Sequence, residues 1–169
     1  MNNPQVSIGL QNPKSPTNVG AVLRAAGCFG AGSILYTGNR YDRAASFHTD
    51  TKNRSESIPL EGVDCLLEGK TNKAKIICVE LVENATPLHQ FDHPDDAYYV
   101  FGPEDGTIDQ KVIDAADAVV YIPTTGCLNL AATVNVVLYD RLAKSKSIDT
   151  SNELISQSKD FNNRIKLRQ

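Results

Sequence analysis

Short apolar runs separated by segments of helical periodicity constrain the fold of this chain more than any other feature. Four predominantly apolar runs have the length of single strands, at 6–10, 74–81, 97–102 and 118–123, and SILYTG at 33–38 is a further candidate. Strands that are buried on both faces are typical of parallel sheets. We therefore predict an α/β fold, with a mostly parallel sheet and helices on both of its faces.

The intervening segments predict three helices. The first covers 17–30, with Thr17 or Asn18 as its N-cap. The others cover 107–117 and 127–143, and the last of these is apolar almost throughout, as a buried helix would be. In such a fold, ligands are expected at the carboxyl ends of the strands.

The chain shows no internal repeat or linker, and its 169 residues fit one domain. We predict a single domain over 1–145 and a basic C-terminal tail over 146–169 that is either part of this domain or flexible. The N-terminus lacks the pattern of a signal peptide, and no apolar run approaches the roughly 20 residues that span a bilayer. The cysteines form no metal-binding spacing, so we expect mostly buried thiols in a cytoplasmic protein (Cys28, Cys65, Cys78 and Cys127).

Charge is unevenly distributed along the sequence, although the net charge is only −3. Residues 1–54 carry six lysines and arginines against two acids, residues 55–140 carry four against fifteen, and residues 141–169 carry seven against three. Two basic ends around an acidic middle are compatible with a localised phosphate-binding face, and equally with ordinary solvated surfaces.

An arginine stands in unusual surroundings in TNVGAVLRAAGCFG (17–30). The residues one helical turn before and after Arg24 are all small, which leaves room for something to approach closely. Because an unpaired buried cation is costly, either Arg24 pairs with a carboxylate inside the protein, or this helix face meets a site that needs a cation.

Two later stretches carry polar residues next to apolar runs. In YYVFGPEDG (98–106), Gly102 at the end of a strand would let the backbone approach a ligand, with Glu104 at the same rim; a simple turn with a solvent-facing acid fits equally well. In YIPTTGCLNLAATVNVVLYD (121–140), Asn129 stands among apolar residues, where a helix cap or a core hydrogen bond would account for it.

The remaining sequence patterns do not indicate a metal site, a phosphate-binding loop or a nucleophilic serine. His89 and His93 have helical spacing, but Pro94 follows directly and no further ligands stand out, so we expect a surface loop and no metal. The sequence contains neither a P-loop nor a dinucleotide-binding fingerprint, and no serine lies in a G-x-S-x-G elbow.

Taken together, NVGAVLRAAGCFGA, FGPEDGTID and IPTTGCLNLAATVNVVLYD resemble, in order and spacing, the three motifs of the TrmH/SpoU family, which are RNA ribose 2′-O-methyltransferases of the SPOUT superfamily. The resemblance runs from about Val6 to Leu142. It implies a sheet whose C-terminal segment forms a trefoil knot, S-adenosylmethionine (SAM) bound in this knot, and a homodimer as the active unit.

The resemblance also implies roles for individual residues. Four residues match the catalytic positions of the family motifs: Asn18, Arg24, Glu104 and Asn129. Five residues fall where the family holds SAM: Leu81, Gly102, Ile122, Cys127 and Leu128.

The sequence departs from the family pattern in the second and third motifs. Cys127 replaces the family serine, which is a better hydrogen-bonding group, and the loop after Pro123 is a few residues shorter than usual. Asp105 stands where many members carry a neutral or basic residue. The alternative to an enzyme is therefore a non-catalytic knotted protein that binds RNA or SAM. A doubly wound nucleotide-binding enzyme without a knot is a more distant alternative, which the absence of phosphate loops disfavours.

The implied reaction is attack of a ribose 2′-oxygen on the sulfonium methyl of SAM. Because arginine stays protonated at neutral pH, we expect Arg24 to stabilise the developing alkoxide or to place a phosphate, with Glu104 and Asn18 holding its guanidinium. The first strand begins early in the chain, as in compact wobble-position tRNA methyltransferases, so we expect tRNA rather than rRNA as substrate. Phosphate contacts are expected from the basic residues of the tail NNRIKLRQ (162–169) and from four basic residues elsewhere: Lys14, Arg40, Arg43 and Arg141.

Overall fold

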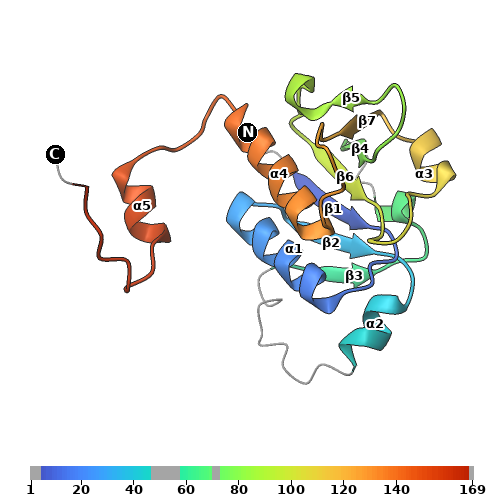
Figure 1. Ribbon diagram of the computed structural model, residues 1–169, viewed down its shortest axis with the longest axis horizontal. Helices are drawn as coiled ribbons and strands as arrows, with labels where there is room; N and C mark the ends of the chain where they lie inside the picture. Colours follow the sequence, from blue (N-terminus) through green and yellow to red (C-terminus); the bar gives the residue numbers. More distant parts are fainter. Residues whose placement is uncertain (1–4, 47–57, 70–72, 168–169) are drawn as a thin grey trace.

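A seven-stranded sheet forms the centre of the computed structural model, which describes residues 5–46, 58–69 and 73–167 (Figure 1). The strand order is β3-β2-β1-β6-β4-β7-β5, and all neighbouring strands pair in parallel, which confirms the predicted sheet. The strands are β1 (Val6–Leu10), β2 (Ser33–Tyr36), β3 (Leu60–Gly62), β4 (Lys75–Val79), β5 (Thr86–Pro87), β6 (Ala97–Phe101) and β7 (Ala118–Tyr121).

Helices and short 3-10 turns connect and follow these strands. In the described part of the chain they are α1 (Pro16–Phe29), α2 (Arg40–Ala45), η2 (Leu66–Gly69), η3 (Leu88–Gln90), α3 (Gln110–Asp114), α4 (Leu130–Ala143) and α5 (Asn152–Ser158). The three predicted helices correspond to α1, α3 and α4. None of the helices within the described residues is long and apolar enough to cross a membrane.

Two separate cores lie on the two faces of the sheet. Successive side chains of a strand point to opposite faces, so β4 and β6 supply both cores. Ile77 and Tyr99 belong to the core that contains the buried residues of α1 and α4. Ile76 and Tyr98 belong to the core that contains those of η2 and α3. This double burial explains why the central strands are apolar throughout, and it confirms helices on both faces.

The start of α1 lies slightly upstream of the predicted position. Ser15 is the N-cap: its hydroxyl accepts a hydrogen bond from the backbone N–H of Asn18 at 3.3 Å. Pro16 follows in the first turn, where a missing N–H costs nothing. The cap is therefore Ser15 rather than Thr17 or Asn18.

Some elements differ from the expectations. Helix α2 follows β2 in a polar segment for which no helix is predicted above, and residues 47–57 lie outside the described part. The short edge strands β3 and β5 carry too few residues for a recognisable pattern. Two of the four cysteines are exposed, contrary to the prediction of mostly buried thiols, because Cys28 lies on the outer face of α1 and Cys127 in the loop before α4.

Helix α4 is tied to the segment before β6 by its last turn. Lys144 donates hydrogen bonds from Nζ to the carbonyl oxygens of Leu88 at 2.7 Å and Phe91 at 3.0 Å. The trefoil knot that the resemblance implies remains a prediction, with which this contact between α4 and an earlier loop is consistent. Beyond α4, residues 145–167 lead away from the sheet and include α5 (Figure 1).

Candidate functional site

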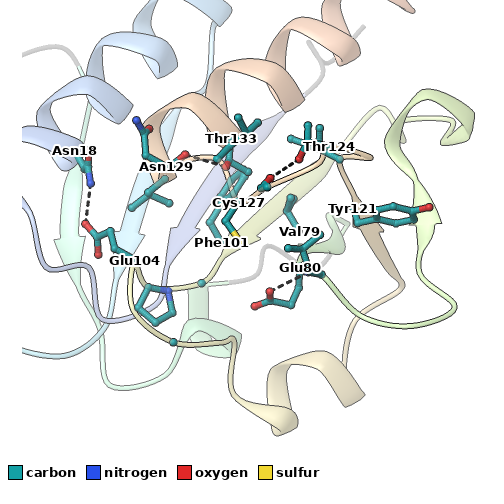
Figure 2. Close-up of a pocket in the computed structure, with 18 residues that line it drawn as sticks. Asn18, Val79, Glu80, Phe101, Glu104, Tyr121, Thr124, Cys127, Asn129 and Thr133 are labelled. Carbon is teal, nitrogen blue, oxygen red and sulfur yellow. Dashed lines mark hydrogen bonds between the residues drawn. The ribbon is translucent and has the colours of Figure 1, made fainter.

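A cavity of about 440 Å³ opens at the carboxyl ends of β4, β6 and β7 (Figure 2). Its wall is formed by the ends of these strands, the loops that follow them, the first turn of α4 and one side chain of α1. This is the edge where open α/β sheets bind their ligands. The cavity brings together three of the four predicted catalytic residues, Asn18, Glu104 and Asn129, and all five predicted cofactor residues: Leu81, Gly102, Ile122, Cys127 and Leu128.

Glu80 links two of the loops that form the cavity. Its carboxylate accepts hydrogen bonds from the backbone N–H of Leu81 at 2.9 Å and of Ile108 at 3.1 Å. A Cβ added to Gly102 would lie 3.1 Å from Glu80 Oε2 and 3.4 Å from the backbone N of Ile108. The close approach of the two loops therefore favours glycine at position 102. Sequence reasoning missed Glu80, although an acid at the end of the apolar run IICVEL was a signal.

Glu104 ties the loop after β6 to the beginning of α1. Its carboxylate accepts hydrogen bonds from the backbone N–H of Lys14 at 2.9 Å and of Ser15 at 3.1 Å, and from the side-chain amide of Asn18 at 3.0 Å (Figure 2). Partial burial raises the pKa of Glu104, but these hydrogen bonds outweigh it and hold the pKa below its ordinary value. Glu104 is therefore a fixed carboxylate at the rim of the cavity.

Arg24 is not held by Glu104 and Asn18, contrary to the expectation. Its side chain is exposed, lies outside the cavity wall, and has no hydrogen-bond or ion-pair partner among the described residues. Six residues along an α-helix correspond to about 600° of rotation and about 9 Å of rise, so Arg24 and Asn18 face different directions on α1. Because Arg24 is exposed, its charge carries no burial cost in this chain.

Asn129 occupies the N-cap position of α4. Its side-chain oxygen accepts the backbone N–H of Ala132 at 2.7 Å, and its backbone carbonyl accepts the hydroxyl of Thr133 at 2.9 Å. The helix cap considered from the sequence is thus present. The side-chain NH₂ of Asn129 has no hydrogen-bond partner among the described residues, so it is free to donate to a ligand at the cavity wall.

Arg40 connects three loops instead of facing solvent. Its guanidinium donates from Nη1 to Asp105 Oδ1 at 2.8 Å and from Nε to the carbonyl oxygen of Asn12 at 3.1 Å. The hydrogen bond from Arg40 lowers the pKa of Asp105 below its ordinary value. Asp105, which departs from the family pattern, therefore pairs with another residue of this chain.

Arg141 is also committed within the protein. It donates from Nη1 to the carbonyl oxygen of Pro94 at 2.5 Å and to Tyr99 Oη at 3.3 Å, and from Nη2 to the carbonyl oxygen of Asp95 at 2.6 Å. Of the four basic residues outside the tail that are expected at phosphates, Arg40 and Arg141 thus have structural partners. Lys14 is exposed, with its Nζ 3.6 Å from Asp105 Oδ2, and Arg43 is exposed with no ion-pair partner for its side chain among the described residues.

His93 lies in a buried network, and the prediction of a surface loop is wrong for it. Its Nε2 is 2.9 Å from Asp140 Oδ2, and its Nδ1 is 2.5 Å from Tyr99 Oη. A carboxylate only accepts, so Nε2 carries the proton and Nδ1 accepts from the tyrosine hydroxyl. Burial lowers the pKa of His93 against the opposing effect of Asp140, with contributions from the nearby cations Lys144 and Arg141.

Metal ligands do not gather in the described part of the chain. Nowhere within 5–46, 58–69 and 73–167 do three or more His, Cys, Asp or Glu side chains form a group that could hold a metal ion. His89, the other histidine of the predicted loop, is exposed and is close to the side-chain amide of Gln90.

Several solved structures share this architecture. A TrmH/SpoU tRNA modifying enzyme from A. aeolicus is 20% identical with a TM-score of 0.71, and the alignment covers 92% of this chain and 85% of that one. A structure whose description concerns the 2-OH methylation of C/U34 on tRNA is 21% identical with a TM-score of 0.69. The alignment covers 85% of this chain and 92% of that one. An AdoMet-bound rRNA methyltransferase from Sinorhizobium meliloti is 18% identical with a TM-score of 0.69, covering 86% and 60%.

These likenesses show the fold, and this chain spans about three fifths of the length of the S. meliloti protein. No curated protein sequence matches the chain. The model of the SpoU rRNA methylase family matches residues 5–139, which include the whole sheet, α1, most of α4 and every residue of the cavity wall. The protein therefore belongs to the SpoU rRNA methylase family.

Proposed function

We propose that the protein transfers the methyl group of SAM to a ribose 2′-hydroxyl of RNA. The observation that carries this proposal is the cavity at the carboxyl ends of β4, β6 and β7, which collects eight of the nine catalytic and cofactor residues that the family resemblance implies. Its volume of about 440 Å³ lies in the range of small-molecule and cofactor sites.

The residues of the cavity fit SAM in shape and charge. Leu81, Ile122 and Leu128 provide apolar surface for an adenine ring, and the absence of a side chain at Gly102 exposes backbone groups to it. Glu80 and Glu104 carry negative charge at the cavity, which suits a ligand with a sulfonium and an ammonium group. When bound, SAM would supply the electrophilic methyl group.

The protein groups would act on the RNA hydroxyl and on its surroundings. The free side-chain NH₂ of Asn129 would orient a ligand oxygen, and the Asn18–Glu104 pair would hold the loop after β6 in place. The guanidinium of Arg24 would stabilise negative charge as it develops on the 2′-oxygen, which requires no deprotonation of the arginine. Preorganised donors of this kind supply a large part of the rate enhancement in many enzymes.

Within this proposal, the active unit is a homodimer in which Arg24 serves the cavity of the partner. Helices α1 and α4 lie side by side on one face of the sheet (Figure 1). Arg24 is exposed on the first, and Val136 and Tyr139 are exposed on the second. A symmetric interface over these helices would carry Arg24 toward the second copy, since its own cavity lies elsewhere.

We further propose tRNA as the substrate. The support is the likeness to a structure that concerns 2-OH methylation of a tRNA nucleotide, of which this chain covers 92%. The exposed cations Lys14 and Arg43 lie in the loop before α1 and in α2, elements that follow the carboxyl ends of β1 and β2 at the same edge of the sheet as the cavity.

Methyl transfer from tritiated SAM to bulk tRNA and to rRNA tests the reaction and its substrate. We expect label in tRNA, located on ribose by mass spectrometry of the digested nucleosides. Label on rRNA alone would contradict the choice of substrate. SAM binding by calorimetry without any transfer would favour the non-catalytic alternative, for which the exposed Cys127 in place of serine is the supporting observation.

A mixing experiment tests the arrangement of the dimer. Arg24→Ala and Asn129→Ala are each expected to be inactive alone. If Arg24 serves the partner cavity, mixed dimers contain one intact site, and random mixing restores about a quarter of the wild-type activity. If Arg24 serves its own cavity, no mixture regains activity.

A further inference from the structure

Within the described residues, the segment after Lys144 makes no hydrogen bond to the domain beyond the end of α4. We call residues 145–167 the C-terminal arm. Its hydrogen bonds either stay within the arm or reach Leu142, and Figure 1 shows it leading away from the sheet. The arm lies beyond residues 5–139, which the family model matches.

Large apolar side chains are exposed along the arm. Phe161 is 85% exposed, and Ile165 and Leu167 are each 97% exposed. Single exposed apolar residues are common on protein surfaces, but a short segment with six of them marks an interaction site. The six residues are Ile148, Leu154, Ile155, Phe161, Ile165 and Leu167.

The arm has local order of its own. Ser151 caps α5, and its hydroxyl accepts the backbone N–H of Leu154 at 3.1 Å. Asp149 and Asp160 accept the backbone N–H of the second residue after each, at 2.8 and 3.1 Å. A segment that is shaped in this way before it binds loses less conformational entropy when it docks.

The net charge of the arm favours a protein surface over the phosphate contacts that its basic residues Arg164 and Lys166 were expected to make. Residues 145–167 carry four basic and three acidic side chains, a balance of +1, which is too small to hold a phosphate backbone strongly. The middle of the chain, residues 55–140, has four basic and fifteen acidic side chains. A weakly basic, apolar arm is complementary to the acidic surface of another copy.

Exposed apolar side chains follow one another along the sequence from α4 into the arm. Val136, Tyr139 and Leu142 are exposed along the helix from which the arm departs, and Ile148 follows in the arm. The same helix belongs to the interface of the proposed homodimer. Because the arm follows α4 directly, an interface that covers α4 would place the start of the arm next to the second copy.

We propose that the C-terminal arm packs against a second copy of this chain and buries its apolar side chains there. The proposal rests on the homodimer of the proposed function. It adds to the interface over α1 and α4 a second contact, in which the arm of each copy packs on the other copy. Arm and domain are thereby exchanged between copies in the manner of arm-exchanged symmetric dimers.

Isotope-coded cross-linking of the full chain tests this arrangement. Chains labelled with ¹⁴N and ¹⁵N are refolded together and treated with a lysine-reactive cross-linker. We expect Lys146, Lys159 and Lys166 of the arm to link to lysines of the domain in mixed-isotope pairs. Links within one isotope only would mean that the arm folds back on its own domain, which overturns the proposal.

The same data separate the arm from the dimer itself. Mixed-isotope links between domain lysines, without any arm-to-domain links, would support the homodimer but overturn the proposal that the arm packs on the second copy. A monomeric mass by light scattering, with no mixed-isotope links at all, would remove the homodimer and the arm together. Methyl transfer by such a monomer would still support the proposed reaction.

A matched pair of variants supplies the energetic test. Phe161→Ser/Ile165→Ser/Leu167→Ser removes apolar contacts, and Lys146→Gln/Lys159→Gln/Lys166→Gln removes charge. We expect the first to raise the dimer dissociation constant by at least about tenfold and the second by less than about threefold. The exposed positions leave the folding of each copy unchanged. Unchanged dimerisation of the first variant, or lost RNA affinity as the sole effect of the second, would overturn the proposal.

Discussion

The two ends of α4 are both polar, and they do different work. At the N-terminal end, Asn129 caps the helix and leaves its side-chain NH₂ without a partner at the cavity. At the C-terminal end, Asp140, Arg141 and Lys144 have all their principal hydrogen-bonding groups engaged by residues of the segment 88–99 or by one another. Polar groups that the chain itself satisfies hold the fold together, whereas groups with open hydrogen-bonding capacity beside a cavity are candidates for function.

The presence or absence of hydrogen-bond partners within the chain also separates the arginines, which the sequence alone could not do. Arg40 and Arg141 have partners in their own chain, whereas Arg24 has none among the described residues. We therefore expect Arg24 to matter for activity and Arg141 for stability. Substitutions at these two positions should give opposite results.

Arg24→Ala should have the largest effect. We expect the rate of methyl transfer to fall by at least about 10²–10³-fold, since a donor to the developing charge is lost. The dissociation constant for SAM should stay within about twofold, because Arg24 does not line the cavity of its own chain. Initial rates with tritiated SAM and calorimetric titration measure the two quantities. Weak SAM binding with the rate preserved would mean that Arg24 binds SAM and does not stabilise the charge that develops on the 2′-oxygen.

Arg141→Ala should instead lower the free energy of unfolding by about 2–3 kcal/mol. The substitution removes charge-assisted hydrogen bonds and leaves the carbonyl oxygens of Pro94 and Asp95 without their donor. Urea denaturation measures the change, and the methyl-transfer rate of the folded variant should change by less than about threefold. Arg43→Ala, at an exposed arginine of α2, is the matched control and should be neutral in stability. A stable but inactive Arg141→Ala would refute the comparison.

The fold and the composition of the cavity could be predicted from the sequence because both depend on local patterns. Apolar runs mark the strands, and the carboxyl ends of parallel strands meet at one edge, so Gly102, Glu104 and Ile122 converge wherever the strands are correctly placed. The three motifs supplied Asn18, Cys127, Leu128 and Asn129, whereas Glu80 was not predicted. A helical rotation count between Asn18 and Arg24 would have shown that they diverge, and this step was available from the sequence.

The remaining features depend on contacts between distant residues. The bond between His93 and Asp140 joins positions 47 residues apart, and the two backbone N–H groups that Glu80 binds include one 28 residues away. Spacing on one element gives no signal for such pairs. The hydrogen-bond partners of a polar side chain also depend on residues that are distant in the sequence. Arg40 and Arg141 were therefore predicted to contact phosphates, although both have partners within the chain.

Glu104→Gln sharpens the comparison at the cavity, with a smaller expected effect. In the wild type, the two carboxylate oxygens accept the backbone N–H groups of Lys14 and Ser15. Glutamine has one acceptor oxygen, and its NH₂ cannot accept a hydrogen bond, so one of these two bonds is lost. We expect a loss of about 1–2 kcal/mol in unfolding free energy and about a tenfold slower methyl transfer. Glu83→Gln, at an exposed acid in the loop after β4, is the control. Equal effects of the two substitutions would mean that the loop after β6 does not depend on this carboxylate.

The smallest effect is expected from protonation of the buried histidine. Burial lowers the pKa of His93, so the unfolded chain binds a proton at a higher pH than the folded chain does. The contribution of His93 to stability is complete above the ordinary histidine pKa of about 6.5, and it is lost as the pH falls below that value toward the folded pKa. Urea denaturation between pH 5 and 8 should show this loss in the wild type. His93→Gln should flatten the slope, whereas His89→Gln, at an exposed histidine, should keep it. Parallel curves for His93→Gln and the wild type would show that the network at the end of α4 is indifferent to the charge on this ring.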